Sequence, residues 1–154
     1  LLGEEGKALN TISEVIDLAT LAISAEAVGI MQKMNELTLD YTKTREQFGQ
    51  ALSKFQALQH RMVDTFMVHE QTKSLLLMAA AKMNDKAADT SKSISALKYQ
   101  IGSAAKLIGE ESIQLHGGMG VTEEMSIGHY FKRLTTIRTI FGNSDYHLKR
   151  YSSL

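Results

Sequence analysis

Apolar residues recur every three or four positions along much of this chain, which is the spacing of an amphipathic helix. A first stripe predicts a helix over about 7–41, with a buried face made of Ile12, Val15, Ile16, Leu18, Leu21, Ala22, Ala25, Val28, Met31 and Leu37. A second predicts a helix over about 54–84, with a buried face made of Phe55, Leu58, Met62, Phe66, Leu76 and Met83. The pattern breaks over 42–50, so the first half predicts two long helices with a short connection.

The second half repeats this alternation of helix and break. We expect Asp89 or Thr90 to cap a third helix that runs to about Leu115. Its buried face comprises Leu97, Ile101, Ala104, Ala105, Ile108 and Ile113. Glycines at 117, 118 and 120 end it, a fourth helix follows over 126–141, and Ser144 caps a short terminal helix through Leu154. Short connections favour antiparallel neighbours, so we expect an all-α fold, an up-down-up-down four-helix bundle with a short C-terminal helix.

Composition narrows the class of protein further. The 154 residues contain no proline and no cysteine, and their formal net charge is zero. The absence of proline favours long helices, the absence of cysteine excludes disulfides and thiolate chemistry, and the balanced charge gives no sign of a nucleic-acid partner. No apolar run reaches the roughly 18 residues of a membrane span. The chain opens at Leu1 rather than Met, so we expect residues 1–154 to be one domain cut from a larger polypeptide.

The break between the first two helices carries the motif Arg45-Glu46-Gln47-Phe48-Gly49. A guanidinium pairs with two phosphate oxygens at once, which suits a pyrophosphate. An aromatic ring can stack on a flat heterocycle. The alternative is structural, because an arginine at a helix C-terminus and a hydrophobic loop anchor would have the same sequence.

A second motif, Gln114-Leu115-His116-Gly117-Gly118-Met119-Gly120, follows about 65 residues later. Three glycines in four positions expose backbone N–H groups that a phosphate or an adenine-bearing ligand can approach. A simple tight turn would also explain them. His116 has no second histidine or cysteine at metal spacing, so the sequence gives no zinc site. We expect His116 to donate or accept a hydrogen bond in the loop rather than to act as a general base.

Taken together, these motifs resemble the C-terminal helical domain of the flavin-dependent acyl-CoA dehydrogenases. The resemblance extends over the whole chain and includes Leu2-Gly3-Glu4-Glu5-Gly6, Val28-Gly29-Ile30-Met31-Gln32 and Phe141-Gly142-Asn143. It implies FAD as cofactor, an acyl-CoA substrate and a tetramer built through the bundle. It implies that the cofactor is contacted by Arg45, Gln47, Phe48, Phe55, Gln56, Gln114, His116, Gly117, Gly118, Asn143 and Asp145. Phe141 and Gly142 would face the substrate.

The resemblance also implies a missing catalytic base. The family places its glutamate just before the late glycine or on the first helix, and these positions hold Phe141 and Ala19 here. Neither side chain accepts a proton, so we expect no catalytic residue in this chain. Glu26 and Asp145 are alternative carboxylates, although a solvent-exposed face or an ion pair explains each more simply. The absent base makes the chain most similar to the small subunits of heteromeric bacterial acyl-CoA dehydrogenases, which act on dicarboxylic (pimeloyl-CoA) or steroid-side-chain thioesters.

Three functions are compatible with this resemblance. The first is α,β-dehydrogenation of a CoA thioester, with a partner subunit that supplies the glutamate and a flavoprotein that accepts the electrons. The second is a structural or assembly subunit that contacts flavin without turnover. The third is another flavin reaction on the same fold, such as oxidation by oxygen or nitroalkane chemistry. We expect a location in the bacterial cytoplasm, with the mitochondrial matrix as the alternative.

Overall fold

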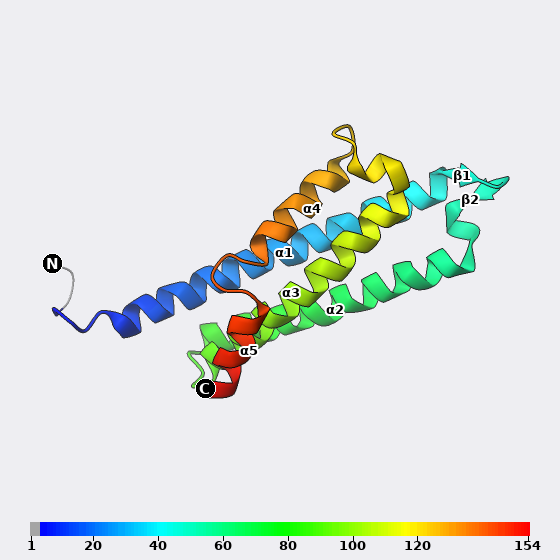
Figure 1. The fold of residues 1–154 in the computed structure, drawn as a ribbon. Coiled ribbons are helices and arrows are strands. Elements are labelled where there is room, and N and C mark those ends of the chain that lie inside the picture. The colour runs from blue at the N-terminus through cyan, green and yellow to red at the C-terminus, as the bar shows by residue number, and fades with distance from the viewer. Residues whose placement is uncertain (1–3) are drawn as a thin grey trace.

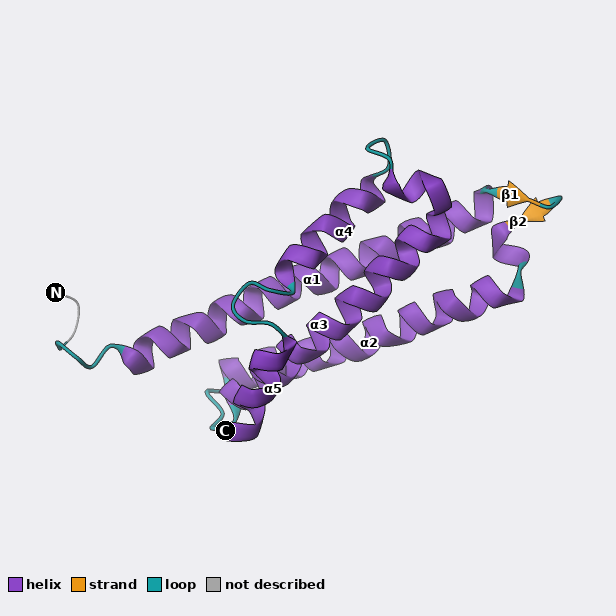
Figure 2. Ribbon diagram, viewed as in Figure 1, coloured by secondary structure: helices purple, strands orange, loops and turns teal. Residues whose placement is uncertain are grey.

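A computed structural model describes residues 4–154, which form a long helical bundle with one short hairpin (Figure 1). The resemblance at Leu2 and Gly3 lies outside these residues. In chain order the elements are α1 (Leu9–Thr44), β1 (Glu46–Gln47), β2 (Gln50–Ala51), the 3-10 helix η1 (Leu52–Lys54), α2 (Gln56–Asn84), α3 (Thr90–His116), the 3-10 helix η2 (Gly117–Val121), α4 (Ser126–Ile137) and α5 (Ser144–Ser153). Figure 2 shows how little of the described chain is strand. The predicted all-α class is confirmed.

Helix α3 lies at the centre of the bundle and contacts α1, α2, α4 and α5. Its predicted buried face is confirmed, because Leu97, Ile101, Ala104 and Ile108 are fully buried and Ala105 is nearly so. Ile113 packs at the edge of this core. Two glycines let neighbours approach α3 closely. A Cβ atom at Gly102 would lie 1.9 Å from the Ser144 hydroxyl oxygen, and one at Gly109 would lie 2.9 Å from the Phe131 ring.

The predicted inner face of α1 is confirmed at Val28 and Met31, which are buried, but it is wrong in the first turns of the helix. Ile12, Val15 and Leu18 are each more than half exposed, with exposed fractions of 52%, 60% and 57%. Small or polar residues are buried instead, among them Thr20 and Ser24. Both hydroxyls donate to the carbonyl four residues earlier, so they are satisfied within the helix and let α3 approach α1 closely.

The predicted buried face of α2 needs the same correction, because its most buried residues are Thr65, His69, Thr72 and Ala79, while Leu58, Met62 and Leu76 are only partly buried. Phe66, predicted to be buried, is 58% exposed. The apolar periodicity of both helices therefore marks an outer face that this chain leaves uncovered.

The structure corrects the predicted helix ends as well. Helix α4 ends at Ile137 rather than at 141, because Phe141 and Gly142 adopt left-handed conformations with φ of 58° and 102°. Asn143, not Ser144, caps α5, since its side-chain oxygen accepts a hydrogen bond from the Tyr146 amide at 2.9 Å. Asp89 occupies the cap position of α3 but makes no side-chain cap bond.

The carboxylate of Asp89 forms an ion pair with Lys82 instead. The hydroxyl of Thr90, the other expected cap, donates to the carbonyls of Lys82 and Ala87. The turn before α3 is therefore closed by side chains that bond backward to α2 rather than forward to α3.

A buried ion pair joins the start of α1 to α5. The guanidinium of Arg150 donates to both carboxylate oxygens of Asp17, at 2.6 and 2.9 Å. The Ser91 hydroxyl donates to the same carboxylate at 2.6 Å, and the Asp17 side chain is only 5% exposed. This carboxylate therefore ties α1, α3 and α5 together.

We expect Asp17→Asn to lower the free energy of unfolding by about 3 kcal/mol, because it leaves the Arg150 charge inside the fold without a counter-charge. Urea denaturation of the purified domain at pH 7 measures this loss. The control is Glu123→Gln, which removes an exposed partner of Lys132 and should leave the unfolding midpoint unchanged. Equal unfolding midpoints for Asp17→Asn and the wild type would contradict the stabilising role of the Asp17–Arg150 ion pair.

Candidate functional site

The first motif forms the tip of the bundle. Arg45 follows the last turn of α1, and the chain reverses through an antiparallel hairpin in which Glu46 pairs with Ala51 and Gln47 with Gln50. Phe48 and Gly49, with φ of 55° and 79°, form the two-residue turn between them. Positive φ at both positions is typical of a type I′ hairpin turn. The hairpin therefore places Arg45 and Gln47 beside the end of α3.

The second motif forms the last turn of α3 and the 3-10 helix η2. Gly117 ends α3 with φ 57° and ψ −143°, a conformation that a residue with a Cβ atom adopts only under strain. Gly118 has an ordinary φ, and a Cβ atom there would meet no other atom within 4 Å. The backbone of this turn is therefore open to an approaching group.

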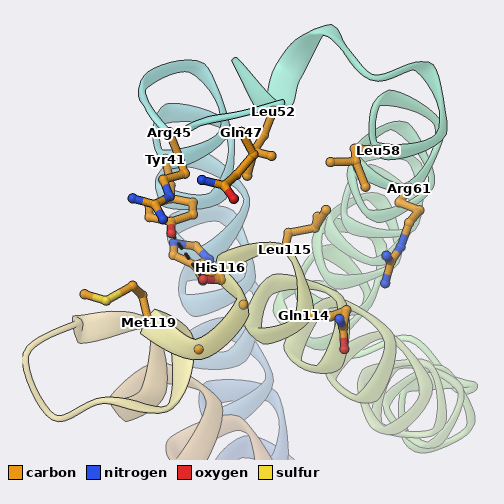
Figure 3. A pocket seen from close by; sticks show the side chains of 12 residues that line it. Tyr41, Arg45, Gln47, Leu52, Leu58, Arg61, Gln114, Leu115, His116 and Met119 are labelled. Atoms are coloured by element: carbon orange, nitrogen blue, oxygen red, sulfur yellow. Dashed lines mark hydrogen bonds between the residues drawn. The ribbon is translucent and has the colours of Figure 1, made fainter. Parts of the chain in front are cut away.

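A pocket of about 480 Å³ lies between the two motifs and α2. Figure 3 shows Tyr41 and Arg45 beside His116 on one side, and Arg61 reaching from α2 on the other. Its lining consists of Tyr41, Arg45, Gln47, Leu52, Leu58, Arg61, Gln114, Leu115, His116, Gly117, Gly118 and Met119. The fold thus brings two motifs that are far apart in sequence to one cavity.

His116 is the buried polar group of this pocket. Its Nδ1–H donates to the Ser112 carbonyl at 2.8 Å, and its ring stacks on Tyr41 with centroids 4.4 Å apart. The Tyr41 hydroxyl in turn donates to the His116 carbonyl. Burial lowers the pKa of His116, so the imidazole is neutral at pH 7. Its Nε2 is a buried acceptor without a partner among the described residues, which suits a ligand hydroxyl and not a phosphate.

Arg45 supplies the positive charge of the pocket. It is exposed and has no ion pair within residues 4–154. Arg61 is different, because its Nε atom donates to the Glu111 carboxylate at 2.5 Å and its charge is balanced. The free cation, the open glycine turn and the unpartnered histidine acceptor fit a phosphate-containing ligand with hydroxyl groups, such as a dinucleotide.

Phe48, Phe55 and Gln56, which are also predicted to contact the cofactor, do not line this pocket. Phe48 projects from the hairpin tip with 93% of its surface exposed, and its ring meets Phe55 edge-on at 6.2 Å. Gln56 opens α2 and is exposed. These residues lie next to the pocket along the chain, but this chain alone gives them no cavity.

The other predicted residues form a second group, far from the first. Phe141, Gly142, Asn143 and Asp145 lie between α4 and the first turn of α5, beside the middle of α3 and away from the hairpin (Figure 1). Gly102 faces Ser144, and His116 follows Gly102 by fourteen residues, so the two groups are separated by about 21 Å along α3 at 1.5 Å per residue.

Two buried side chains hold the second group. The ammonium of Lys98, on α3, donates to the carbonyls of Ile137, Arg138 and Gly142 at 2.9, 3.4 and 3.0 Å. Nε2 of His147, on α5, donates to the Phe141 carbonyl at 2.9 Å. Both side chains are 1% exposed. Burial lowers the pKa of Lys98 to about 8 and also lowers the pKa of His147.

The carboxylates that were alternative bases are engaged or exposed. Glu26 accepts two hydrogen bonds from Arg133, at 2.5 and 2.8 Å. These bonds lower the pKa of Glu26, which makes it a weaker base. Asp145 is exposed in the first turn of α5. Ala19 is half-buried and Phe141 is 42% exposed, and neither accepts a proton.

Sequence reasoning missed several residues that line the pocket. Tyr41 lies one helical turn before Arg45, and Leu58 and Arg61 are three residues apart on one face of α2. Their helical spacing from residues that were predicted, such as Arg45, could have indicated them. Spacing alone does not show which face of a helix lines the pocket. Among residues 4–154 no three histidine or acidic side chains cluster as metal ligands, and no helix there is long and apolar enough to cross a membrane.

The fold defines a helical-bundle domain with a pocket between its hairpin, α2 and the end of α3, and comparisons identify the family. A family description, "Acyl-CoA dehydrogenase, C-terminal domain", matches residues 6–152. The acyl-CoA dehydrogenase IpdE2 of Mycolicibacterium smegmatis is 34% identical over 135 residues, which cover 87% of this chain and 41% of that protein. The chain therefore belongs to the acyl-CoA dehydrogenase family, whose members are FAD-dependent.

Solved structures of relatives share the fold. The Tcur3481-Tcur3483 steroid acyl-CoA dehydrogenase G363A variant superimposes with a TM-score of 0.90 at 29% identity, over 96% of this chain and 40% of that one. Butyryl-CoA dehydrogenase from Megasphaera elsdenii gives a TM-score of 0.93 at 26% identity, over 98% of this chain and 39% of that one. The chain thus spans about 40% of the length of these relatives.

We expect the difference in unfolding free energy between the wild type and Lys98→Met to depend on pH. Above pH 8 the folded protein has released the Lys98 proton while the unfolded chain, with a pKa near 10.5, still holds it. The difference should therefore grow in favour of the wild type by about 1–2 kcal/mol between pH 8 and pH 10. Urea titrations of both proteins at several pH values measure it. A difference in unfolding free energy that stays constant between pH 8 and pH 10 would contradict the lowered pKa of Lys98.

Proposed function

We propose that this domain completes the FAD site of an acyl-CoA dehydrogenase that catalyses α,β-dehydrogenation of a CoA thioester. The observation that carries the proposal is the pocket in which Arg45, His116 and the open turn at Gly118 meet. A family relative that shares 34% identity and the match to the C-terminal domain support the reaction class. FAD would supply the hydride acceptor, and the chain's own residues would bind and orient it.

Each polar group of the pocket has a role that follows from its chemistry. Arg45 would pair with the diphosphate, because its guanidinium is uncompensated. Gly118 would let the ligand approach the backbone N–H groups of the turn. Neutral His116 would accept a hydrogen bond from a ribose hydroxyl at Nε2. Gln47 and Gln114 offer amides at opposite edges of the same cavity, as Figure 3 shows.

We propose that the two groups of residues serve two different active sites. They lie about 21 Å apart along α3, which favours a cofactor shared with a neighbouring subunit at the hairpin end. Uncovered apolar faces support association. On α1 and α2 the exposed apolar side chains include Leu9, Ile12, Val15, Leu18, Val63, Phe66, Met67 and Leu77. A homo- or hetero-tetramer would bury them.

The late loop would face the acyl-CoA but would not remove its proton. Phe141 occupies one family base position and Ala19 the other, and Glu26 is paired with Arg133. We therefore propose that a partner subunit supplies the glutamate, as in the heteromeric members of the family. The Tcur3481-Tcur3483 steroid dehydrogenase carries two protein designations in its name, which supports a heteromeric arrangement. A flavoprotein would accept the electrons.

The second candidate is a structural or assembly subunit without turnover. The apolar residues Phe141 and Ala19 at the two family base positions favour this candidate, because a subunit that only scaffolds a tetramer needs no carboxylate there. The two candidates differ in whether a flavin that this chain contacts is ever reduced.

We expect Arg45→Gln, in the full-length protein, to weaken FAD binding about 10- to 100-fold through loss of a charge-assisted contact. Gly118→Ala should weaken it as well, because its methyl group would occupy the ligand's approach, while urea denaturation shows no loss of stability. Flavin fluorescence on dilution measures the dissociation constant. Lys43→Gln, which removes an exposed cation outside the pocket, is the control and should bind FAD normally. FAD binding unchanged in Arg45→Gln would count against the site.

The reaction is tested by following the flavin spectrum during anaerobic addition of a panel of acyl-CoAs. We expect bleaching only when the full-length protein is combined with its partner subunit. Bleaching by the protein alone would show that it carries its own base. No bleaching in either case, with FAD bound, would favour the structural subunit.

A further inference from the structure

The loop between α4 and α5, residues 138–143, is fixed by groups that the predicted FAD contacts do not include. The Lys98 ammonium lies beneath it and donates to three carbonyls, two at the end of α4 and one at Gly142. A single buried cation therefore joins both ends of the loop. Helix α4 needs such a donor, because the last carbonyls of a helix have no partner within it.

His147 holds the same loop from α5. Its Nε2–H donates to the Phe141 carbonyl, and its ring meets the Tyr146 ring edge-on at 5.0 Å. Residue 142 must be glycine in this conformation, because a Cβ atom there would lie 2.4 Å from the Tyr146 ring. Two successive carbonyls of the loop are thus hydrogen-bonded, that of Phe141 by His147 and that of Gly142 by Lys98.

These hydrogen bonds hold the backbone of the loop in a strained conformation. Phe141 is a bulky residue with φ of 58°, a left-handed conformation that is strained for such a side chain. Without the two buried donors, the loop would relax toward ordinary backbone angles and the residue 141 side chain would turn elsewhere. The ammonium and the imidazole are 1% exposed, so water does not replace them.

We propose that Lys98 and His147 are positioning residues that set the direction of the residue 141 side chain toward the acyl-CoA. The inference rests on the proposed function, in which Phe141 and Gly142 face the substrate. Neither side chain touches the ligand. They act through the loop carbonyls, so their loss weakens acyl-CoA binding while FAD binding at the distant hairpin end is unaffected.

The experiment uses the full-length holoenzyme with its partner subunit and compares Lys98→Met with the wild type. Lys98→Met keeps the length of the side chain and removes its donors. Lys106→Met is the matched control, because Lys106 is an exposed lysine on the same helix. Hydrogen exchange of residues 138–143, the KM for acyl-CoA, kcat and the FAD content are measured for each protein.

For Lys98→Met we expect exchange at residues 138–143 to rise at least about tenfold and the KM to rise about tenfold, with kcat and FAD content little changed. Lys98→Arg should recover part of both losses. His147→Phe, which keeps a ring and removes the donor, should show the same pattern and covers the case in which Lys98→Met does not fold. Lys106→Met should match the wild type.

Unchanged exchange at residues 138–143 in Lys98→Met and His147→Phe would overturn the inference, and this measurement needs no substrate. A rise in exchange that spreads equally over α1, α2 and α3 would also overturn it, since it would indicate a purely structural role. Faster loop exchange with an unchanged KM would overturn the link to the substrate. A wild-type enzyme that retains FAD but binds no acyl-CoA would instead overturn the proposed function.

Discussion

The close packing of α3 against its neighbours is the constraint on which the rest of this structure depends. Gly102 and Gly109 have no room for a Cβ atom, because Ser144 and Phe131 occupy that space. These contacts fix α4 and α5 along one side of α3, and the small residues of α1 allow close packing on the other. Since both candidate regions are attached to α3, its rigidity sets the distance between them.

Buried polar groups around α3 fix how the neighbouring helices and loops are oriented against it. Asp17 bonds across helices, Lys98 bonds from α3 to the end of α4 and the loop after it, and His147 bonds from α5 to the same loop, whereas the apolar core is compatible with small rotations of the helices. Isolated buried charges are costly, and these are retained with partners on other elements. They therefore specify where α5 and its preceding loop lie, and the hydrophobic contacts supply most of the stability.

The sequence was sufficient for the fold class and for the apolar part of the inner face of α3, such as Leu97 and Ile101, although Ser95 and Lys98 are buried on the same helix. It failed on the first half of α1, because that helix has an apolar outer face and an inner face containing Thr20 and Ser24. Periodicity identifies apolar stripes but not what covers them. It could not predict that the carbonyl of Ile137, the last residue of α4, accepts a hydrogen bond from a lysine 39 positions earlier.

The candidate site likewise has features that the local sequence predicts and features that depend on how the chain folds. Residues in the two motifs could be predicted from their chemistry, and the fold brings Arg45 and His116 to one pocket. The sequence could not show that the late loop lies elsewhere, because separation along α3 is a property of the folded chain. If the two regions serve two different active sites, as we propose, each site needs residues from a neighbouring subunit. The uncovered apolar faces of α1 and α2 then have a function, because association that buries them would also complete the sites.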